Sequence, residues 1–402
     1  MLLSDQAKEI ISRSCPIMGT EITSLSSSLG RALAEDIVAR EDVPTFDNSG
    51  MDGYALRTSD DAAHMDGISL KIVGEVAAGD VYPGVVGDGE AVKVMTGAPI
   101  PTGADAVIEQ EQVKEENGKL RVSGPVERGC NIRSRGEDIR SGDRLLERGK
   151  RLRPFELGVL ASLGISEVSV YARPEVAILT MGNELVPIDQ APGPGQIRNS
   201  NAVTLQALVH ECGAKAILFD PCKDDEDHLR EALEAGLLSD VLISSGGVSV
   251  GEYDLVLNVL KSIGVKILFW RVNIKPGKPV AFGLFEGRGR AVPVFALPGN
   301  SVSTAVTFIE YVRPALLRMM GATGWEPLRL MAELKGEIRK NDGKRQFLRG
   351  ILRNESGRLI VQSTGSQGSA VMTSFLKANC LIIVPEEVRE VTEGNMVEIK
   401  LL

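Results

Sequence analysis

Glycine, serine and carboxylate residues follow three predicted strands at the points where those strands end. In open α/β sheets ligands collect at the carboxyl ends of strands, and helix N-termini preceded by small residues bind oxyanions through free backbone N–H groups. Three such loops in one sheet predict an oxyanion site, whereas a tight turn alone would explain a single loop. The segments are EVAILTMGNEL (175–185), VLISSGGVSVGEYD (241–254) and VPVFALPGNS (292–301). They contain Glu184, Asp254 and the candidate binding residues Ser244, Ser245, Gly246, Gly247, Ser249, Pro298, Gly299 and Asn300.

Two lysines bracket a rigid turn in the segment WRVNIKPGKPVAF (270–282). Pro276 and Gly277 separate Lys275 from Lys278, and the stiff backbone keeps the two ammonium groups near each other. Such groups repel unless an anion lies between them, and the compact charge of lysine suits a tetrahedral oxyanion. The segment therefore predicts an oxyanion site, and a solvated turn is the alternative interpretation.

Further carboxylates lie in glycine-rich or arginine-rich surroundings. Asp52 lies in VPTFDNSGMDGYAL (43–56), and Asp138 follows two arginines in NIRSRGEDI (131–139). Asp224 lies in KDDEDHL (223–229), where helix capping is the simpler explanation. Hard carboxylate oxygens suit Mg²⁺, which neutralises a pyrophosphate or a second oxyanion. Loops, lysines and carboxylates together predict a site for a multiply anionic substrate and Mg²⁺, without a covalent nucleophile.

The composition argues against several functional classes. The 402 residues include 45 Lys and Arg against 54 Asp and Glu, so the net charge of −9 argues against a nucleic-acid partner. Five scattered cysteines without a C-x-x-C pair favour reduced thiols in a cytosolic protein. We find no apolar run of membrane-spanning length and no signal-peptide pattern, and we expect a soluble cytoplasmic protein without a membrane partner. The P-loop and dinucleotide-binding patterns are also absent, which argues against common nucleotide hydrolysis and NAD chemistry.

The elements that must position these residues change character along the chain. In residues 1–40 we expect two helices, the first capped by Ser4 and the second carrying Leu25, Leu29 and Leu33 at helical spacing. A helix is expected again from Pro154 to about Gly164. We therefore predict four domains: a linking domain of residues 1–40 and 140–172, an inserted β-rich lobe of residues 41–139, an α/β domain of residues 173–325, and a C-terminal β domain of residues 326–402.

Residues 175–320 alternate apolar strands with amphipathic helices. This alternation predicts a parallel sheet covered by helices on both faces. The predicted fold class is therefore a multidomain α/β plus β protein with a central doubly wound α/β domain, the inserted β-rich lobe and a small C-terminal domain like a β-barrel.

Eight motifs in order resemble those of the molybdopterin molybdenumtransferases, the bacterial molybdenum-insertion enzymes related to the gephyrin E domain. The resemblance begins near residue 4 and continues to the C-terminus. The motifs are MDGYA (51–55), MTGAP (95–99), NIRSRGEDI (131–139), MGNEL (181–185), SSGGVSVGEYD (244–254), IKPGKP (274–279), ALPGN (296–300) and GSQGSAVMTSF (365–375).

The resemblance implies an elongated homodimer that inserts molybdate into adenylylated molybdopterin and releases AMP with the assistance of Mg²⁺. In that family the pocket lies between the central domain of one subunit and the β lobe of the other, so Asp52 and Asp138 would act in trans. Other cofactor-biosynthesis proteins are candidate partners. The functional positions carried over by motif are Asp52, Thr96, Asp138, Glu184, Asp224, Asp254, Lys275, Lys278 and Ser369, of which Asp52, Asp254 and Glu184 are candidate Mg²⁺ ligands.

Two other functions and three departures from the family pattern stay open at this point. Adenylylation of molybdopterin would use the same α/β domain, and a non-catalytic scaffold would use only the dimer. Ser301 stands where we expect proline, and Ser would be a competent helix N-cap. Asn183 stands where the family often has aspartate, and Met181 where it often has a small or hydroxyl residue.

Overall fold

The computed structural model describes residues 1–58, 66–247, 255–287, 289–324 and 326–402. The chain forms two compact units, and each is described by itself. Unit 1 comprises residues 1–34, 149–153 and 168–402, and unit 2 comprises residues 35–148 and 154–167. The finer division into four domains stays a prediction. No helix in the described part of the chain has the length and apolar character needed to cross a membrane.

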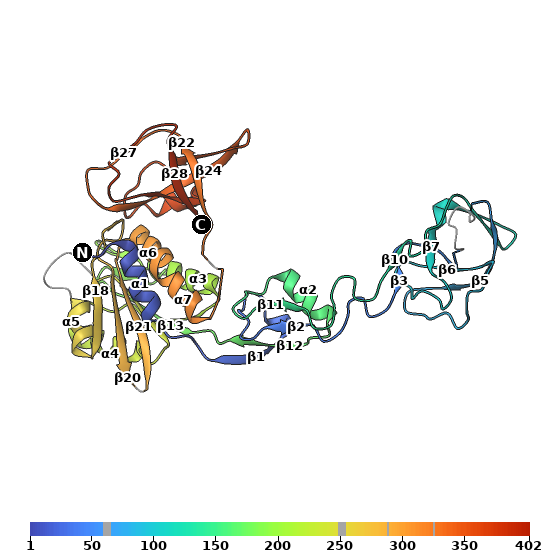
Figure 1. Cartoon of the computed structure of the whole chain (residues 1–402). Coiled ribbons are helices and arrows are strands. Elements are labelled where there is room, and N and C mark those ends of the chain that lie inside the picture. The colour runs from blue at the N-terminus through green and yellow to red at the C-terminus, as the bar shows by residue number, and fades with distance from the viewer. Residues whose placement is uncertain (59–65, 248–254, 288, 325) are drawn as a thin grey trace. The chain divides into compact units, whose positions relative to one another are not determined.

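Unit 1 contains a six-stranded central sheet in the order β16-β13-β17-β21-β20-β18. Strands β16, β13, β17 and β21 run parallel, as the alternation predicted, whereas β20 runs antiparallel to both of its neighbours. The order brings the carboxyl ends of β13, β17 and β21 side by side (Figure 1). The strands are β13 (Glu175–Thr180), β16 (Lys215–Leu218), β17 (Val241–Ser245), β18 (Val265–Trp270), β20 (Ala281–Gly287) and β21 (Arg290–Leu297).

Helices cover both faces of this sheet, which confirms the doubly wound prediction. Alternate strand residues divide between two cores, so that Ile178 packs with α3 and α6 while Leu179 packs with α4 and α5. Helix α6 continues through a π-helical turn, η4, into α7. The helices are α3 (Ser200–Cys212), α4 (Glu226–Gly236), α5 (Leu255–Ser262), α6 (Ser301–Thr307), η4 (Phe308–Val312) and α7 (Arg313–Met319).

The N-terminal segment contains one of the two predicted helices. Helix α1 (Ser4–Ser14) buries Ala7 and Ile11 in the same core as α3 and α6. The predicted cap is wrong, because Leu3 occupies the N-cap position and Ser4 is the first helical residue. The second predicted helix is wrong. Residues Thr20–Ser24 form strand β1, which pairs with β12 (Glu167–Tyr171), and only Leu25–Ser27 form a 3₁₀ turn, η1. Serine and β-branched residues are weak helix formers, and the leucine spacing alone did not compensate for them.

The C-terminal part of unit 1 is a closed five-stranded β-barrel. Strands β24, β25, β22, β28 and β26 pair in that order, and β26 pairs back onto β24. The short strand β19 (Ile274–Lys275), which precedes the barrel residues in the chain, pairs in parallel with β24. The barrel strands are β22 (Arg329–Leu334), β24 (Arg345–Glu355), β25 (Arg358–Ser363), β26 (Cys380–Val384) and β28 (Met396–Leu401).

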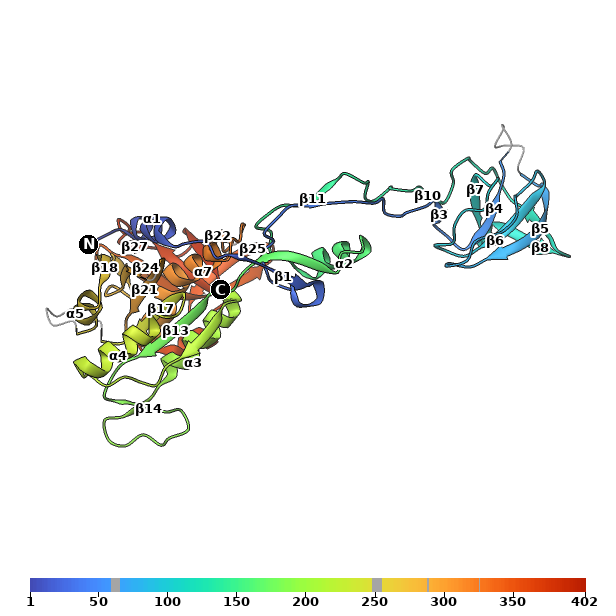
Figure 2. The same cartoon turned by 90° about the horizontal axis from the view of Figure 1, so that it is seen from below.

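Unit 2 contains a six-stranded sheet in the order β7-β4-β6-β5-β9-β8 (Figure 2). Both faces of the sheet carry apolar side chains, with Tyr54 and Leu56 in one core and Ala55 in the other. Helix α2 (Pro154–Ser162) also belongs to this unit and was predicted. The strands are β4 (Gly53–Leu56), β5 (Ser69–Val76), β6 (Glu90–Val94), β7 (Ala106–Glu109), β8 (Val113–Glu116) and β9 (Lys119–Val122).

Short paired strands complete the two units. In unit 2, β2 (Ile37–Val38) pairs with β11 (Arg144–Leu146), and β3 (Asn48–Ser49) pairs with β10 (Ile132–Arg133). In unit 1, β14 (Leu185–Val186) pairs with β15 (Ile197–Arg198), and β23 (Ile338–Arg339) pairs with β27 (Glu390–Val391). Single 3₁₀ turns occur at η3 (Gln110–Gln112) and η5 (Met372–Leu376).

Candidate active site

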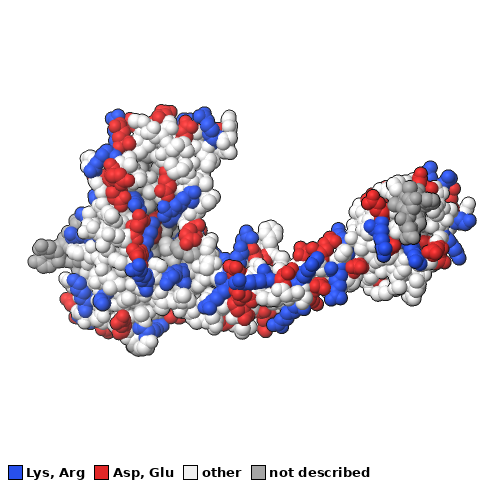
Figure 3. Space-filling view, in the orientation of Figure 1, with Lys and Arg blue, Asp and Glu red and all other residues white. Residues whose placement is uncertain are grey.

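A cleft of about 610 Å³ opens at the carboxyl ends of β13, β17 and β21. On the face drawn in Figure 3, acidic and basic side chains are interspersed. The cleft itself is identified by its lining residues. The N-termini of α3 and α6 both contribute to its wall. The predicted residues that it brings together are Glu184, Asp224, Ser245, Gly246, Gly247, Pro298, Gly299 and Asn300.

The loop after β17 needs its two glycines. A Cβ at Gly246 would lie 2.3 Å from the Met181 carbonyl oxygen, and one at Gly247 would lie 2.5 Å from Val256 Cγ2 and 2.7 Å from Met181 Sδ. Both glycines also have positive φ, at 101° and 66°. The buried Met181 side chain therefore packs directly under the loop, which gives this departure from the family pattern a structural role.

The two serines before these glycines differ in whether they line the cleft. Both serines are buried, but Ser245 lines the cleft, whereas Ser244 does not and its hydroxyl has no hydrogen-bond partner in the described residues. Successive side chains on a strand point to opposite faces, so Ser244 is not expected at the cleft surface. Ser249 and Asp254 lie outside the described residues.

The hydroxyl of Ser245 belongs to a hydrogen-bond network between loops. It donates to the Pro298 carbonyl at 3.2 Å, and the Thr304 hydroxyl donates to the same carbonyl at 2.6 Å. Asn201, on the first turn of α3, donates through Nδ2 to Ser245 Oγ at 3.1 Å. The two glycine loops are thus joined by side chains as well as by the sheet.

The loop after β21 connects the cleft to the segment that holds Ser369. Asn300 Nδ2 donates to Ser369 Oγ at 3.0 Å, and the Val302 N–H donates to the Ser369 carbonyl at 3.1 Å. The expectation that Ser301 caps helix α6 is wrong. Asn300 occupies the N-cap position without a side-chain cap, its Nδ2 atom donates to Ser369, and Ser301 is the first helical residue. Proline also suits that first position, so serine preserves the start of the helix.

Glu184 and Asp224 lie on two loops that contact each other. The Asn183 Oδ1 atom accepts a hydrogen bond of 3.1 Å from the Asp224 N–H, and an aspartate at 183 could accept the same bond. Asp225, and not Asp224, caps helix α4 by accepting from the His228 N–H at 3.0 Å. The capping explanation therefore applies to Asp225 and leaves the exposed Asp224 carboxylate at the cleft.

The two lysines of the IKPGKP segment do not line one common cavity. Lys275 lies on β19 at the edge of the barrel, 3.4 Å from Asp342, and lines a second cavity of about 470 Å³. Lys278 is half-buried and precedes Pro279, which lines the first cleft. The segment therefore runs from one cavity to the other. The segment with Gly368 and Ala370 does the same, because Gly368 lines the second cavity and Ala370 the first.

Arg349 lines the second cavity and was not among the predicted site residues. It is fully buried on β24, donates from Nε to Ser374 Oγ at 2.9 Å and from Nη2 to the Gly368 carbonyl at 3.2 Å. Its Nη1 atom has no hydrogen-bond partner within the described residues, and burial lowers its pKa. A buried guanidinium with a free donor is costly unless a ligand completes it. An arginine in the middle of the apolar run FLRGIL was the available sequence signal.

Unit 2 brings Asp52 and Thr96 together. Asp52 Oδ1 accepts hydrogen bonds from the Thr96 N–H at 2.7 Å and from the Thr96 hydroxyl at 2.8 Å. These two bonds, the backbone one first, lower the pKa of Asp52, so its carboxylate is ionised at neutral pH. Asp138 is exposed in the same unit, where its N–H donates to the Val43 carbonyl at 3.1 Å.

The carboxylates do not form a metal site within the described residues. No group of three or more His, Cys, Asp or Glu side chains there could hold a metal ion. Of the three predicted Mg²⁺ ligands, Glu184 lines the cleft and Asp52 belongs to unit 2, while Asp254 lies outside the described residues. The donor set present in the cleft, Glu184 and Asp224, has the hard oxygens that Mg²⁺ prefers.

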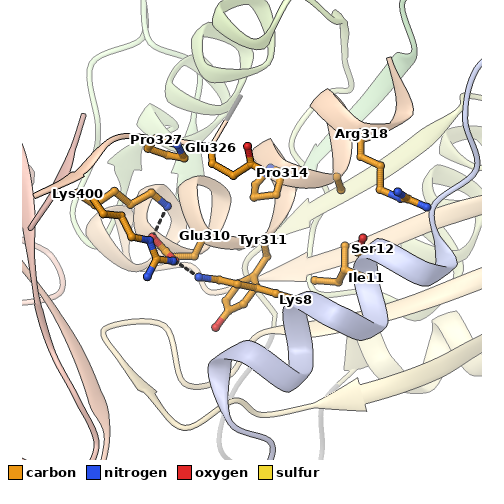
Figure 4. A pocket seen from close by; sticks show the side chains of 12 residues that line it. Lys8, Ile11, Ser12, Glu310, Tyr311, Pro314, Arg318, Glu326, Pro327 and Lys400 are labelled. Atoms are coloured by element: carbon orange, nitrogen blue, oxygen red, sulfur yellow. Dashed lines mark hydrogen bonds and ion pairs between the residues drawn. The ribbon is translucent and has the colours of Figure 1, made fainter. Parts of the chain in front are cut away.

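A third cavity, of about 210 Å³, lies beside α1, η4 and α7 (Figure 4). Glu310 is buried there between two ammonium groups, with Lys8 Nζ and Lys400 Nζ each 2.6 Å from its carboxylate. Burial alone would raise the pKa of Glu310, but the two lysines hold it below the usual value. None of the predicted site residues lines this cavity, and its ion pairs join α1, η4 and β28.

The doubly wound sheet and its glycine-rich loops lie in the part of the chain that matches a class of molybdopterin-binding domains. Residues 177–318 match the family model described as "Probable molybdopterin binding domain". Residues 3–164 match "MoeA N-terminal region (domain I and II)", and residues 331–402 match "MoeA C-terminal region (domain IV)".

Full-length relatives have the same assignment. The chain is 39% identical over 405 residues to the molybdopterin molybdenumtransferase of Haemophilus influenzae, covering 100% of this chain and 98% of the relative. It is 34% identical to that of Staphylococcus aureus strain COL, covering 94% and 90%. The crystal structure of a molybdopterin biosynthesis moeA protein from Pyrococcus horikoshii OT3 superposes with a TM-score of 0.85 at 33% identity, covering 100% of both chains.

The chain therefore belongs to the molybdopterin molybdenumtransferase family. The predicted enzyme class and its role in molybdenum cofactor biosynthesis are confirmed at this level.

Proposed function

We propose that this chain inserts molybdate into adenylylated molybdopterin and releases AMP with the assistance of Mg²⁺. The observation that carries the proposal is the single cleft where two glycine loops, two helix N-termini and two carboxylates meet. Such a cleft suits a long, multiply anionic substrate, because loops and helix ends bind phosphate oxygens and the carboxylates suit a divalent cation.

The phosphates of the substrate bind the loops Ser245–Gly247 and Pro298–Asn300 in this account. Both loops lie at the sheet edge, where backbone N–H groups and helix dipoles favour anions. Ser245 does not act as a nucleophile in this account, because its proton is donated to the Pro298 carbonyl and no base among the described residues accepts it. We therefore expect no covalent enzyme intermediate.

Molybdate binds the second cavity, between Lys275 and Arg349. Molybdate is a tetrahedral dianion, and the free Nη1 donor of Arg349 supplies the charge-assisted hydrogen bond that the buried guanidinium otherwise lacks. The segments 275–279 and 368–370 each line both cavities, which supports transfer of the metal between neighbouring sites. Lys278 and Ser369 lie on these connecting segments.

Glu184 and Asp224 would hold Mg²⁺, together with the predicted ligands Asp52 and Asp254. The bound cation supplies charge neutralisation of the phosphoanhydride that joins the pterin phosphate to AMP. The two cleft carboxylates and their loops orient that end of the substrate, and the Asn183–Asp224 hydrogen bond holds the two loops in contact.

We further propose that the active form is a homodimer in which Asp52, Thr96 and Asp138 of one subunit complete the cleft of the other. The proposal rests on the family resemblance and on the ionised, preorganised Asp52 carboxylate, which is exposed and bonded only to Thr96 among the described residues.

AMP release from adenylylated molybdopterin, measured with Mg²⁺ in the presence and absence of molybdate, tests the proposed function. We expect release that molybdate stimulates and that accompanies formation of metal-loaded pterin. A folded protein that releases no AMP under either condition, also with tungstate, would contradict the proposal and favour adenylyl transfer or a scaffold.

A further inference from the structure

Asn201 is a polar residue of the cleft that none of the sequence motifs singled out. It lies on the first turn of α3, and its Nδ2 atom donates to the Gly299 carbonyl at 2.7 Å, to Ser245 Oγ at 3.1 Å and to Thr304 Oγ1 at 3.3 Å. These acceptors belong to three different elements, namely the loop before α6, the end of β17 and α6 itself.

The three atoms that surround the Asn201 amide require a hydrogen-bond donor at that point. The hydroxyls of Ser245 and Thr304 both donate to the Pro298 carbonyl, so each has lone pairs, and no proton, to offer Asn201. The Gly299 carbonyl can only accept. The amide must therefore present its NH₂ group to these three atoms, which fixes its orientation.

The helix that carries Asn201 is itself fixed to the sheet. Asn199, its N-cap, donates from Nδ2 to Thr180 Oγ1 at 2.7 Å and accepts from the Ala202 N–H at 3.2 Å. Within the described residues, and apart from the pairing of β17 with β21, two hydrogen bonds join the loops without Asn201. The Gly246 N–H donates to the Leu297 carbonyl, and the Ser245 hydroxyl donates to the Pro298 carbonyl.

We propose that Asn201 is a positioning residue for the reaction, which holds the loops Ser245–Gly247 and Pro298–Asn300 at the spacing that the substrate phosphates require. Its effect on the reaction rests on the proposed function, whereas its effect on the loops does not. The amide acts through the loops, since its NH₂ group is used by protein acceptors.

The test compares Asn201→Asp with the wild type and with Gln206→Ala as a control. Aspartate has nearly the same shape as asparagine but no NH₂ group, so it retains packing and loses the donor. Gln206 is an amide on the same helix, and its side chain forms no hydrogen bond with the described residues. Hydrogen exchange of peptides that contain Gly246 or residues 298–304 reports the loops, and the KM for adenylylated molybdopterin reports the reaction.

We expect Asn201→Asp to speed exchange in both loops and to raise the KM about tenfold, the factor that corresponds to roughly one lost hydrogen bond. Gln206→Ala should change neither. Exchange equal to the wild type would overturn the proposal, and so would faster exchange with an unchanged KM. A wild-type protein that releases no AMP would instead contradict the proposed function, and the exchange data would still decide whether Asn201 positions the loops.

Discussion

At the scale of single residues, Arg349 and Lys275 are the cations that distinguish the second cavity. Arg349 is fully buried with one free donor, whereas the Lys275 side chain is 57% exposed and 3.4 Å from Asp342. A buried donor without a partner gains more from an anion than a hydrated one does, because it has no water to displace. We therefore expect Arg349 to contribute more to molybdate affinity.

Replacement of Arg349 by methionine should raise the molybdate KM about 10-fold to 100-fold, as expected for loss of a charged hydrogen bond of about 1.5–3 kcal/mol. Arg353→Met is the matched control, since Arg353 is exposed on the same strand. Molybdate-dependent AMP release measures the effect. Lys275→Met provides a second variant that leaves the barrel core intact. An equal KM in the wild type, Arg349→Met and Lys275→Met would contradict the assignment of this cavity.

The Asp52–Thr96 pair makes a pH-dependent prediction. The pKa of Asp52 is lowered, first by the Thr96 N–H and then by its hydroxyl, so the ionised carboxylate persists as the pH falls below the usual carboxyl range. Thr96→Val removes only the hydroxyl bond, and the pKa of Asp52 should rise part of the way to its usual value. The acidic limb of the pH–rate profile should therefore move to higher pH. An acidic limb that moves to lower pH in Thr96→Val would contradict this role. If Asp52→Asn is inactive, which shows that the carboxylate is needed, an unchanged limb in Thr96→Val would contradict it as well.

At the scale of elements, the buried carboxylate of Glu310 joins three parts of unit 1. Its ion pairs with Lys8 and Lys400 connect η4 to α1 and to the barrel strand β28 (Figure 4). Removal of one member of a buried ion pair leaves an uncompensated charge, which is more costly than loss of a surface pair. Of the two lysines that would lose their partner with Glu310, Lys400 is the more deeply buried.

Glu310→Ala should lower the free energy of unfolding by about 3–5 kcal/mol, because both lysines lose their partner. Glu9→Ala is the control, since Glu9 forms an exposed pair with Arg13 and should cost less than about 0.5 kcal/mol. Urea denaturation of the two variants measures the difference. Because the pKa of Glu310 is lowered in the folded protein, its stabilisation should be complete above the usual carboxyl pKa and be lost on acidification. Equal losses for the two variants would contradict the account.

Strands with continuous apolar runs could be predicted from sequence. Strands without such a run, which form only because they pair with a strand far along the chain, could not. EVAILT and CLIIVP became β13 and β26 because their burial requires extended pairing in any arrangement. Strand β20 contains two glycines and a glutamate, and β28 alternates charged with apolar residues, so their pairing depends on neighbours far along the chain. The leucines of residues 25–33 had helical spacing in a segment of serines, and the spacing misled the prediction.

The same distinction applies to the cleft. Glycine loops at strand ends could be predicted because sheet topology brings parallel strand ends together. The separation of Lys275 from the first cleft depends on its pairing with Gln346 of β24, which lies far along the chain. Arg349 and Asn201 escaped prediction because their roles arise from hydrogen bonds across several elements, which no local spacing reveals.

At the scale of the whole molecule, the predicted catalytic residues divide between the two compact units. Asp52, Thr96 and Asp138 belong to unit 2, and Glu184, Asp224 and Lys275 belong to unit 1. If the site is completed between subunits, a defect in unit 2 of one subunit and a defect in unit 1 of the other should leave one intact site in a hybrid dimer.

Asp52→Ala should therefore fold and lose insertion activity, and Lys275→Ala should fold and be nearly inactive at molybdate concentrations far below its raised KM. Mixing the two variants at such a concentration should restore part of the activity. AMP release from purified hybrid dimers, with each variant carrying a different affinity tag, measures the rescue. Homodimers of each variant, mixed without subunit exchange, are the control. Verified hybrids without activity would contradict a site shared between subunits.

The most direct test of the central claim measures AMP and metal-loaded pterin in the same single-turnover reaction, with wild-type protein, Mg²⁺ and increasing molybdate. Coupled insertion predicts that the two products appear at the same rate and in equal amounts, and that both decrease together in Asp224→Asn. AMP release that continues at an unchanged rate while no metal enters the pterin would contradict the claim that this cleft couples phosphoanhydride cleavage to molybdate insertion.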